Sequence, residues 1–129
     1  KYVGDSFEGK NVIVVDDMIA SGESVLDVSK AARDLGASKI YLISTFSLFT
    51  RGVEIFDEAY EKGIFDKVIT TNLTYFNPEY RNKPWLETVD CTEKVAKVIY
   101  ALHNGMSLSP LLNETAVMDR MIEKRLVLK

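Results

Sequence analysis

The sequence has few of the residues that build metal sites and disulfides. Its 129 residues include one cysteine, Cys91, and one histidine, His103. A single cysteine cannot form an internal disulfide, and one Cys/His pair is too small a ligand set for structural zinc. We interpret Cys91 as a small packed side chain and His103 as a structural or surface residue. The composition therefore argues against structural zinc and against Cys/His catalysis.

An excess of basic charge and long apolar runs are also lacking. Sixteen lysines and arginines against nineteen aspartates and glutamates give a formal net charge of −3. No surplus is left to neutralise a nucleic-acid backbone or an anionic membrane. The longest apolar runs are shorter than the roughly 20 residues that span a bilayer or carry polar interruptions, and no signal-peptide pattern is present. We expect a cytoplasmic protein that binds neither nucleic acid nor membranes.

The sequence does contain an alternation of short β-branched runs and helical patterns. Strands are predicted over residues 11–15, 39–45, 67–71 and 85–89. Helical spacing of apolar residues predicts helices over 21–35 and 52–62, each ended by a glycine. Because the run 11–15 is almost entirely apolar, we expect this strand to be buried on both faces. The alternation predicts an α/β fold with a mostly parallel sheet flanked by helices.

The last third of the chain predicts a loop and further helices. Residues 72–84 hold two prolines and predict an ordered loop. Thr92 can cap a helix that ends at Asn104-Gly105. Its expected buried face is Val95, Ala96, Val98, Ile99 and Leu102. Residues 114–129 repeat the helical spacing and need another surface to cover them. We therefore predict a domain over 1–112 and a helical extension over 113–129.

Residues 12–24, Val-Ile-Val-Val-Asp-Asp-Met-Ile-Ala-Ser-Gly-Glu-Ser, combine the features of a phosphate site. They run from a strand through a short loop into the start of a helix. A helix N-terminus offers unpaired amides and partial positive charge to an anion. Gly22 lets the backbone approach that anion closely, and the hydroxyls of Ser21 and Ser24 can donate hydrogen bonds.

Two adjacent carboxylates, Asp16 and Asp17, precede this loop. They can accept hydrogen bonds from vicinal sugar hydroxyls or hold a hydrated magnesium ion, so the segment describes a pentose phosphate site. Two plain alternatives stay open: the acids are common turn material, and Ser21 can simply cap the helix. Glu23 is an objection, because a carboxylate repels phosphate unless its side chain points outward.

Residues 12–24 resemble the phosphoribosylpyrophosphate fingerprint of type I phosphoribosyltransferases and ribose-phosphate pyrophosphokinases. The resemblance to the pyrophosphokinases continues through Thr50-Arg51-Gly52, through Val68-Ile-Thr-Thr-Asn72, and through 103–112, His-Asn-Gly-Met-Ser-Leu-Ser-Pro-Leu-Leu. It covers about residues 7–112. It implies a phosphoribosyltransferase-like fold, Rossmann-like with three layers and incomplete at its N-terminus.

The same resemblance implies an activity, the magnesium-dependent transfer of the pyrophosphoryl group of ATP to ribose 5-phosphate. The products are phosphoribosylpyrophosphate and AMP. Asp16 and Asp17 would take the ribose hydroxyls and Mg2+. The 5-phosphate would lie against Ser21, Gly22, Glu23 and Ser24. The ATP-binding and catalytic residues of the family precede this segment, so no catalytic residue is assigned here, and the chain alone is not expected to turn over. A homo-oligomer built from dimers, commonly a hexamer, is also implied.

Two departures from the family pattern keep alternatives open. Ala20 stands where many relatives have an acid, and Glu23 stands where they have glycine. The first departure weakens a second interpretation, a phosphoribosyltransferase that consumes phosphoribosylpyrophosphate. A third interpretation is a non-catalytic regulatory relative that assembles with an active partner. Because the sequence starts at Lys1 rather than at methionine, we also expect a fragment of a longer protein.

Overall fold

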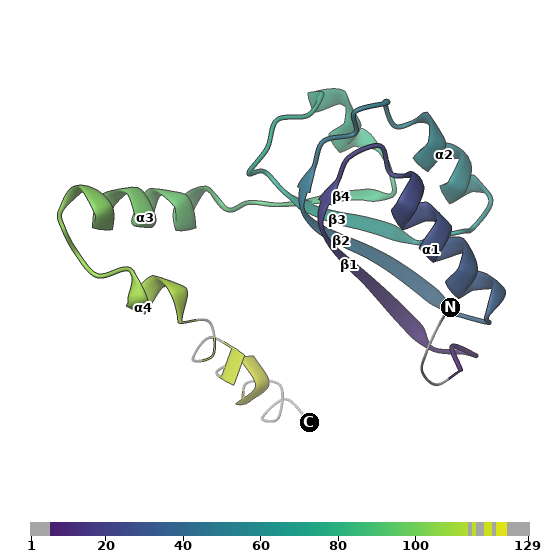
Figure 1. Ribbon diagram of the computed structural model, residues 1–129, viewed down its shortest axis with the longest axis horizontal. Helices are drawn as coiled ribbons and strands as arrows, with labels where there is room; N and C mark the ends of the chain where they lie inside the picture. The colour runs from purple at the N-terminus through teal and green to yellow at the C-terminus, as the bar shows by residue number, and fades with distance from the viewer. Residues whose placement is uncertain (1–5, 114, 116–117, 120, 124–129) are drawn as a thin grey trace. The chain divides into compact units, whose positions relative to one another are not determined.

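The computed structural model describes residues 6–113, 115, 118–119 and 121–123 (Figure 1). The chain divides into two compact units, Lys1–Asp90 and Cys91–Lys129. The first unit contains β1 (Asn11–Ile19), α1 (Glu23–Asp34), β2 (Lys39–Ser47), α2 (Glu54–Glu61), β3 (Lys67–Thr71), the 3-10 helix η1 (Pro78–Asn82) and β4 (Leu86–Val89). Strands and helices alternate as predicted, and the α/β fold is confirmed.

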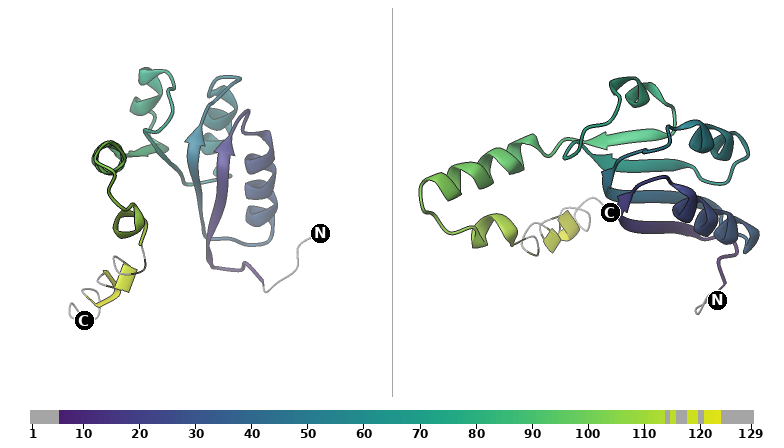
Figure 2. Two further views of the ribbon diagram at one scale, coloured as in Figure 1. Left: turned by 60° about the vertical axis from the view of Figure 1, so that its left-hand side comes forward. Right: turned by 45° about the horizontal axis from the view of Figure 1, so that its top comes forward.

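The four strands form one parallel sheet in the order β1-β2-β3-β4. Lys39 of β2 lies opposite Asn11 of β1, and Lys67 of β3 lies opposite Tyr41 of β2. Every crossover moves in the same direction along the sheet, so right-handed connections place α1 and α2 on the same face (Figures 1 and 2). Within described residues 6–90, the unit therefore contains the sheet and one layer of helices, which are two of the three expected layers.

The core lies between this face of the sheet and the two helices. Ile40 and Leu42 of β2 and Val68 of β3 are fully buried, at alternate strand positions as the two-residue period requires. Val25 of α1 and Phe56 of α2 belong to the same buried cluster. Both helices therefore pack apolar side chains against the sheet.

Aromatic side chains close the core below the loop that joins β3 to β4. Phe49 packs edge-to-face against Phe56 and Phe76, with ring centroids 5.3 and 5.7 Å apart. Trp85 stacks on Phe56 at 5.4 Å and is fully buried. Aromatic pairs of this kind stabilise a core by more than the burial of their apolar surface alone. These rings therefore hold the 72–84 loop against α2.

Strand β1 differs from the prediction in length and in burial. It continues through the acidic pair to Ile19, and it pairs with β2 alone among the described strands. Ile13 and Val15 are 60% and 74% exposed, so the expectation of burial on both faces is wrong. The apolar run could not reveal this, because a sequence pattern does not say whether a neighbouring strand or helix is present.

The second unit contains α3 (Thr92–His103) and α4 (Ser109–Leu112). Helix α3 has the predicted extent, but the predicted cap is wrong, because Cys91 rather than Thr92 occupies the N-cap position. The expected buried face is wrong, because Val95, Ile99 and Leu102 are exposed. Much of the helix predicted over 114–129 lies outside the described residues, and the domain boundary between 112 and 113 stays a prediction. None of the helices in the described part of the chain is long and apolar enough to cross a membrane.

Candidate functional site

The two motif carboxylates lie near the carboxyl end of β1. Asp16 and Asp17 are inside the strand rather than after it. Asp16 is half-buried and lies opposite Ser44 of β2, while Asp17 is exposed. Successive residues of a strand project from opposite faces, so the two carboxylates flank the strand instead of forming a pincer. A ligand that meets both must lie across the end or the free edge of β1.

The loop after β1 places the start of α1 against α2. Gly22 is buried with φ +93°, and a Cβ atom there would lie 2.2 Å from Cζ of Phe56. Only glycine combines this backbone conformation with so close an approach. The amide of Leu26 donates to the carbonyl of Gly22 at 3.0 Å. The amides of the first helical turn precede that bond and have no acceptor within the helix. The local geometry suits an anion.

A second loop, residues 48–53, lies alongside the motif loop. The amide of Leu48 donates to the carbonyl of Ile19 at 2.8 Å, and that of Thr50 donates to the carbonyl of Ala20 at 3.0 Å. These two backbone bonds continue the pairing of β1 with β2 beyond the strands. The connection between β2 and α2 therefore forms one wall of the candidate site.

Glu23 joins the two loops through its carboxylate. Arg51 Nη1 donates to Glu23 Oε1 at 2.7 Å, and Ser21 Oγ donates to Glu23 Oε2 at 3.4 Å. The ion pair is open to solvent, with Glu23 64% and Arg51 67% exposed. The side chain is exposed, as the phosphate interpretation requires, yet its carboxylate accepts from the Ser21 hydroxyl that this interpretation assigns to phosphate. Arg51 had no predicted role, because 28 residues separate it from Glu23 and no local pattern joins them.

Buried hydroxyls lie beside Asp16 at the end of β2. Ser44 Oγ and Ser47 Oγ are 2.8 Å apart, and Ser44 Oγ donates to Thr70 Oγ1 at 3.4 Å. All three residues are at most 3% exposed. Their hydrogen bonds satisfy one another in the core, as buried polar groups require. This cluster fixes the strand ends on which the candidate site stands.

The donor set at Asp16 and Asp17 suits one kind of metal binding. Among the described residues, no group of three or more His, Cys, Asp or Glu side chains could hold a metal ion. Mg2+ commonly binds through one or two carboxylates, with water and substrate phosphates as its other ligands. Two strand carboxylates therefore fit Mg2+ that arrives with a phosphorylated substrate, and they do not fit a self-contained protein cage.

Two other aspartates are held by cations. Asp66, just before β3, accepts from Arg33 Nη2 at 3.0 Å, Lys39 Nζ at 2.8 Å and the Ile40 amide at 2.8 Å. Partial burial raises the pKa of Asp66, but these hydrogen bonds outweigh burial, and its pKa lies below the ordinary value. Asp57 of α2 accepts from Lys83 Nζ at 2.6 Å and Trp85 Nε1 at 2.8 Å. Its pKa is also lowered, because these bonds outweigh the opposing effect of burial.

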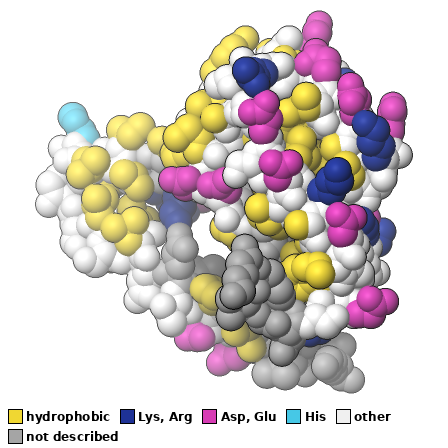
Figure 3. Space-filling model, turned by 45° about the vertical axis from the view of Figure 1, so that its right-hand side comes forward, with side chains coloured by type: hydrophobic (Ala, Val, Ile, Leu, Met, Phe, Trp, Pro, Cys, Tyr) yellow, Lys and Arg dark blue, Asp and Glu magenta, His cyan; other side chains and the backbone are white. Residues whose placement is uncertain are grey.

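The charges on the face shown in Figure 3 are mixed. Among the described side chains visible there, acidic and basic groups are interspersed and do not gather into a broad patch of one sign. The formal net charge of the whole sequence is −3. Neither this face nor the net charge indicates a general positive field that would attract a phosphate.

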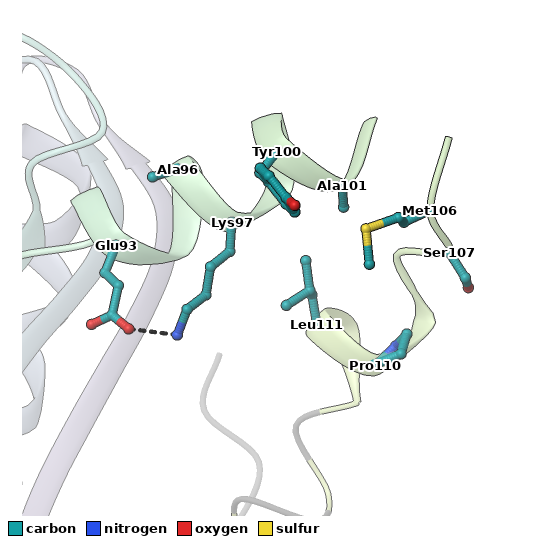
Figure 4. A pocket seen from close by; sticks show the side chains of 9 residues that line it. All are labelled: Glu93, Ala96, Lys97, Tyr100, Ala101, Met106, Ser107, Pro110 and Leu111. Carbon is teal, nitrogen blue, oxygen red and sulfur yellow. Dashed lines mark hydrogen bonds and ion pairs between the residues drawn. The ribbon is translucent and has the colours of Figure 1, made fainter. Parts of the chain in front are cut away.

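The second unit has a hollow of a different character. It has a volume of about 520 Å3 and lies between α3 and α4 (Figure 4). Tyr100, Met106 and Leu111 contribute to a mainly apolar lining. Lys97 also lines it, but its ammonium group is paired with Glu93. A mainly apolar lining does not suit a sugar phosphate, so the candidate site is the motif loop.

Comparison with known proteins identifies related sequences and a related fold. A family model described as "Phosphoribosyl synthetase-associated domain" matches residues 1–113. A ribose-phosphate pyrophosphokinase of Chlorobaculum tepidum is 30% identical over 118 residues, which cover 92% of this chain and 35% of that protein. The phosphoribosyl pyrophosphate synthase-associated protein 2 of Homo sapiens is 29% identical over 117 residues, 91% of this chain and 31% of that protein.

A solved structure has the same fold. The crystal structure of phosphoribosylpyrophosphate synthetase from Mycobacterium smegmatis matches with a TM-score of 0.66 and 20% sequence identity. The match covers 79% of this chain and 33% of that one. The chain therefore spans about a third of the length of the proteins it matches.

Proposed function

This chain belongs to the phosphoribosyl synthetase-associated domain family, and from that premise we propose that it supplies the ribose 5-phosphate site of a ribose-phosphate pyrophosphokinase. The observation that supports the proposal most directly is the buried, positive-φ Gly22, which brings the start of α1 next to the Asp16–Asp17 strand. One element can thus bind a phosphate while the other binds a sugar diol.

In this proposal each part of the motif has one task. The amides at the start of α1, with the hydroxyls of Ser21 and Ser24, bind the 5-phosphate. Asp16 and Asp17 accept hydrogen bonds from the ribose hydroxyls. Magnesium held with the substrate would supply charge neutralisation at the transferred group. The residues of this chain would contribute by positioning the anomeric hydroxyl, since phosphoryl-type transfer depends mainly on positioning and electrostatics.

The remaining parts of the activity are assigned to the longer protein. ATP is the proposed pyrophosphoryl donor, and no residue of these 129 is assigned to bind it. A homo-oligomer built from dimers, up to a hexamer, is the proposed assembly. The exposed apolar residues of α3, Ile99 and Leu102 among them, are surfaces that such an assembly could cover.

Titration calorimetry with ribose 5-phosphate and Mg2+ tests the binding proposal. Asp16→Asn and Asp17→Asn should each weaken binding several-fold, about 1 kcal/mol, because a neutral amide oxygen replaces the charged acceptor. Asp34→Asn is the matched control, because Asp34 is an exposed aspartate at the far end of α1. Unchanged affinity in both site variants would contradict the assignment of the ribose site.

A second candidate function is supported by the human relative, which is named as synthase-associated. A chain of this kind would assemble with an active synthetase and release no AMP by itself. The two candidates are separated by following AMP release from ATP in the full-length protein, with and without ribose 5-phosphate. Release that depends on the sugar phosphate supports the pyrophosphokinase. Binding without release supports the associated protein.

A further inference from the structure

We propose that Glu23 acts as an internal competitor of phosphate and that Arg51 is a phosphate-binding residue which Glu23 occupies in the empty site. This inference rests on the proposed function, and it concerns the regulation of the same site. It starts from the position of Glu23, the first residue of α1, whose carboxylate accepts from one donor in each of the two site loops.

The two donors are of the type that phosphate uses. Guanidinium groups bind carboxylates and phosphates with the same N–H geometry, and a serine hydroxyl donates to either anion. Arg51 Nη1 and Ser21 Oγ each lie within hydrogen-bonding reach of one oxygen of a single carboxylate, at 2.7 and 3.4 Å. They are therefore close enough together for one phosphate group to engage both after Glu23 has moved away.

The backbone keeps these donors in place whichever anion they hold. The bonds from Leu48 to Ile19 and from Thr50 to Ala20 fix the 48–53 loop against the motif loop. Gly22 packs on buried Phe56, which fixes the start of α1. The side chains of Glu23 and Arg51 are exposed, by contrast, so Glu23 can leave without disturbing the core.

The exchange also answers the electrostatic objection to a carboxylate in a phosphate loop. While Glu23 is paired, its charge is compensated by Arg51. When phosphate binds Arg51, Glu23 is released to solvent, and the site keeps one cation for the incoming anion. The cost is a lower affinity, because phosphate must displace the exposed ion pair, whose strength is modest.

Calorimetric titration of the full-length protein with ribose 5-phosphate and, separately, with inorganic phosphate tests the exchange. Glu23→Gln removes the competitor and should tighten both ligands about two- to fivefold, the range that an exposed ion pair supports. Arg51→Gln should weaken both about fivefold or more, because a charge-assisted bond is lost. The effect of Arg51→Gln should be larger when Glu23→Gln is already present, since the arginine is then free in the empty site.

Glu58→Gln is the matched control, because Glu58 forms an equally exposed pair with Lys62 on α2. It should change neither affinity. If Glu23→Gln and Arg51→Gln both bind the two ligands with wild-type affinity, the exchange is wrong and the proposed function still stands. Absence of ribose 5-phosphate binding in every variant would overturn the proposed function itself. Glu23→Ala, with a thermal melt of each variant, separates a binding effect from misfolding.

Discussion

The carboxylates at the two ends of the sheet are held in different ways. At the amino end, Asp66 accepts from an arginine, a lysine and a backbone amide, and its pKa is lowered. At the carboxyl end, Asp16 and Asp17 have no ion-pair partner among the described residues. An acid whose charge is already compensated stabilises the fold, whereas an uncompensated acid keeps its hydrogen-bonding capacity for a ligand. The residue type alone does not distinguish these two roles.

The largest expected effect on stability is at Gly22, in the loop at the carboxyl end of the sheet. Gly22→Ala should lower the free energy of unfolding by about 3 kcal/mol, from a strained φ and from overpacking against Phe56. Gly63→Ala is the control, because Gly63 also has positive φ but nothing lies within 4 Å of an added Cβ. It should lose only about 1 kcal/mol. Equal losses in urea denaturation would show that the contact with Phe56 is unimportant.

Removing the compensated acid should have the next largest effect. Asp66→Ala leaves Arg33, Lys39 and the Ile40 amide without their shared acceptor, and should cost about 2 kcal/mol of unfolding free energy. Asp16→Ala should change stability by less than about 0.5 kcal/mol, because an exposed or half-exposed acid without a partner contributes little. Chemical denaturation of the two variants measures the comparison directly. A loss for Asp16→Ala as large as that for Asp66→Ala would contradict the division of roles.

A smaller effect is expected at Asp57. Asp57→Asn keeps an acceptor for Trp85 Nε1 but loses the charge that faces Lys83 Nζ. Since both side chains of this pair are a third exposed, the expected loss is only about 1 kcal/mol. Trp85, the single tryptophan, reports the unfolding by fluorescence. Lys62→Gln, in the more exposed pair with Glu58, serves as control. Stability unchanged at Asp57 would mean that solvent already screens the pair.

The change of stability with pH is expected to be the smallest of these effects near neutral pH. The pKa values of Asp66 and Asp57 are lowered in the folded chain. Each group therefore adds stability above its unfolded pKa, near pH 4, and that stability is lost as the pH falls through the folded pKa. Thermal melts should be flat between pH 5 and 8 and should fall below about pH 4. The double variant Asp57→Asn, Asp66→Asn should have a shallower acid slope, and an unchanged slope would assign acid unfolding to other groups.

Much of the fold follows from local patterns. The strands 39–45 and 67–71 are predicted from runs rich in apolar and β-branched residues, and the structure places β2 and β3 there. Glycines end the two predicted helices close to where α1 and α2 end. The exposure of Ile13 and Val15 could not be predicted in this way. Burial of a strand depends on neighbours that its own sequence does not describe.

The same distinction between local patterns and distant neighbours applies to the candidate site. Its loop and carboxylates were found from the sequence because they are contiguous in residues 12–24, and their binding roles stay predictions. The contacts of Arg51 with Glu23, and of Arg33 and Lys39 with Asp66, join residues 27 to 33 positions apart. Charges of both signs occur throughout the chain, so no sequence spacing singles out these pairs before the sheet brings them together.

The strand order β1-β2-β3-β4 has a consequence for how the first unit folds. Among the described strands, each pairs with its neighbour in the sequence, and no pairing spans more than one crossover. A parallel sheet cannot have more local strand pairing than this. Such pairing lowers the entropy cost of loop closure, which is the main factor that slows the pairing of parallel strands. During synthesis, each of β2, β3 and β4 can therefore pair with the strand made just before it as the chain leaves the ribosome.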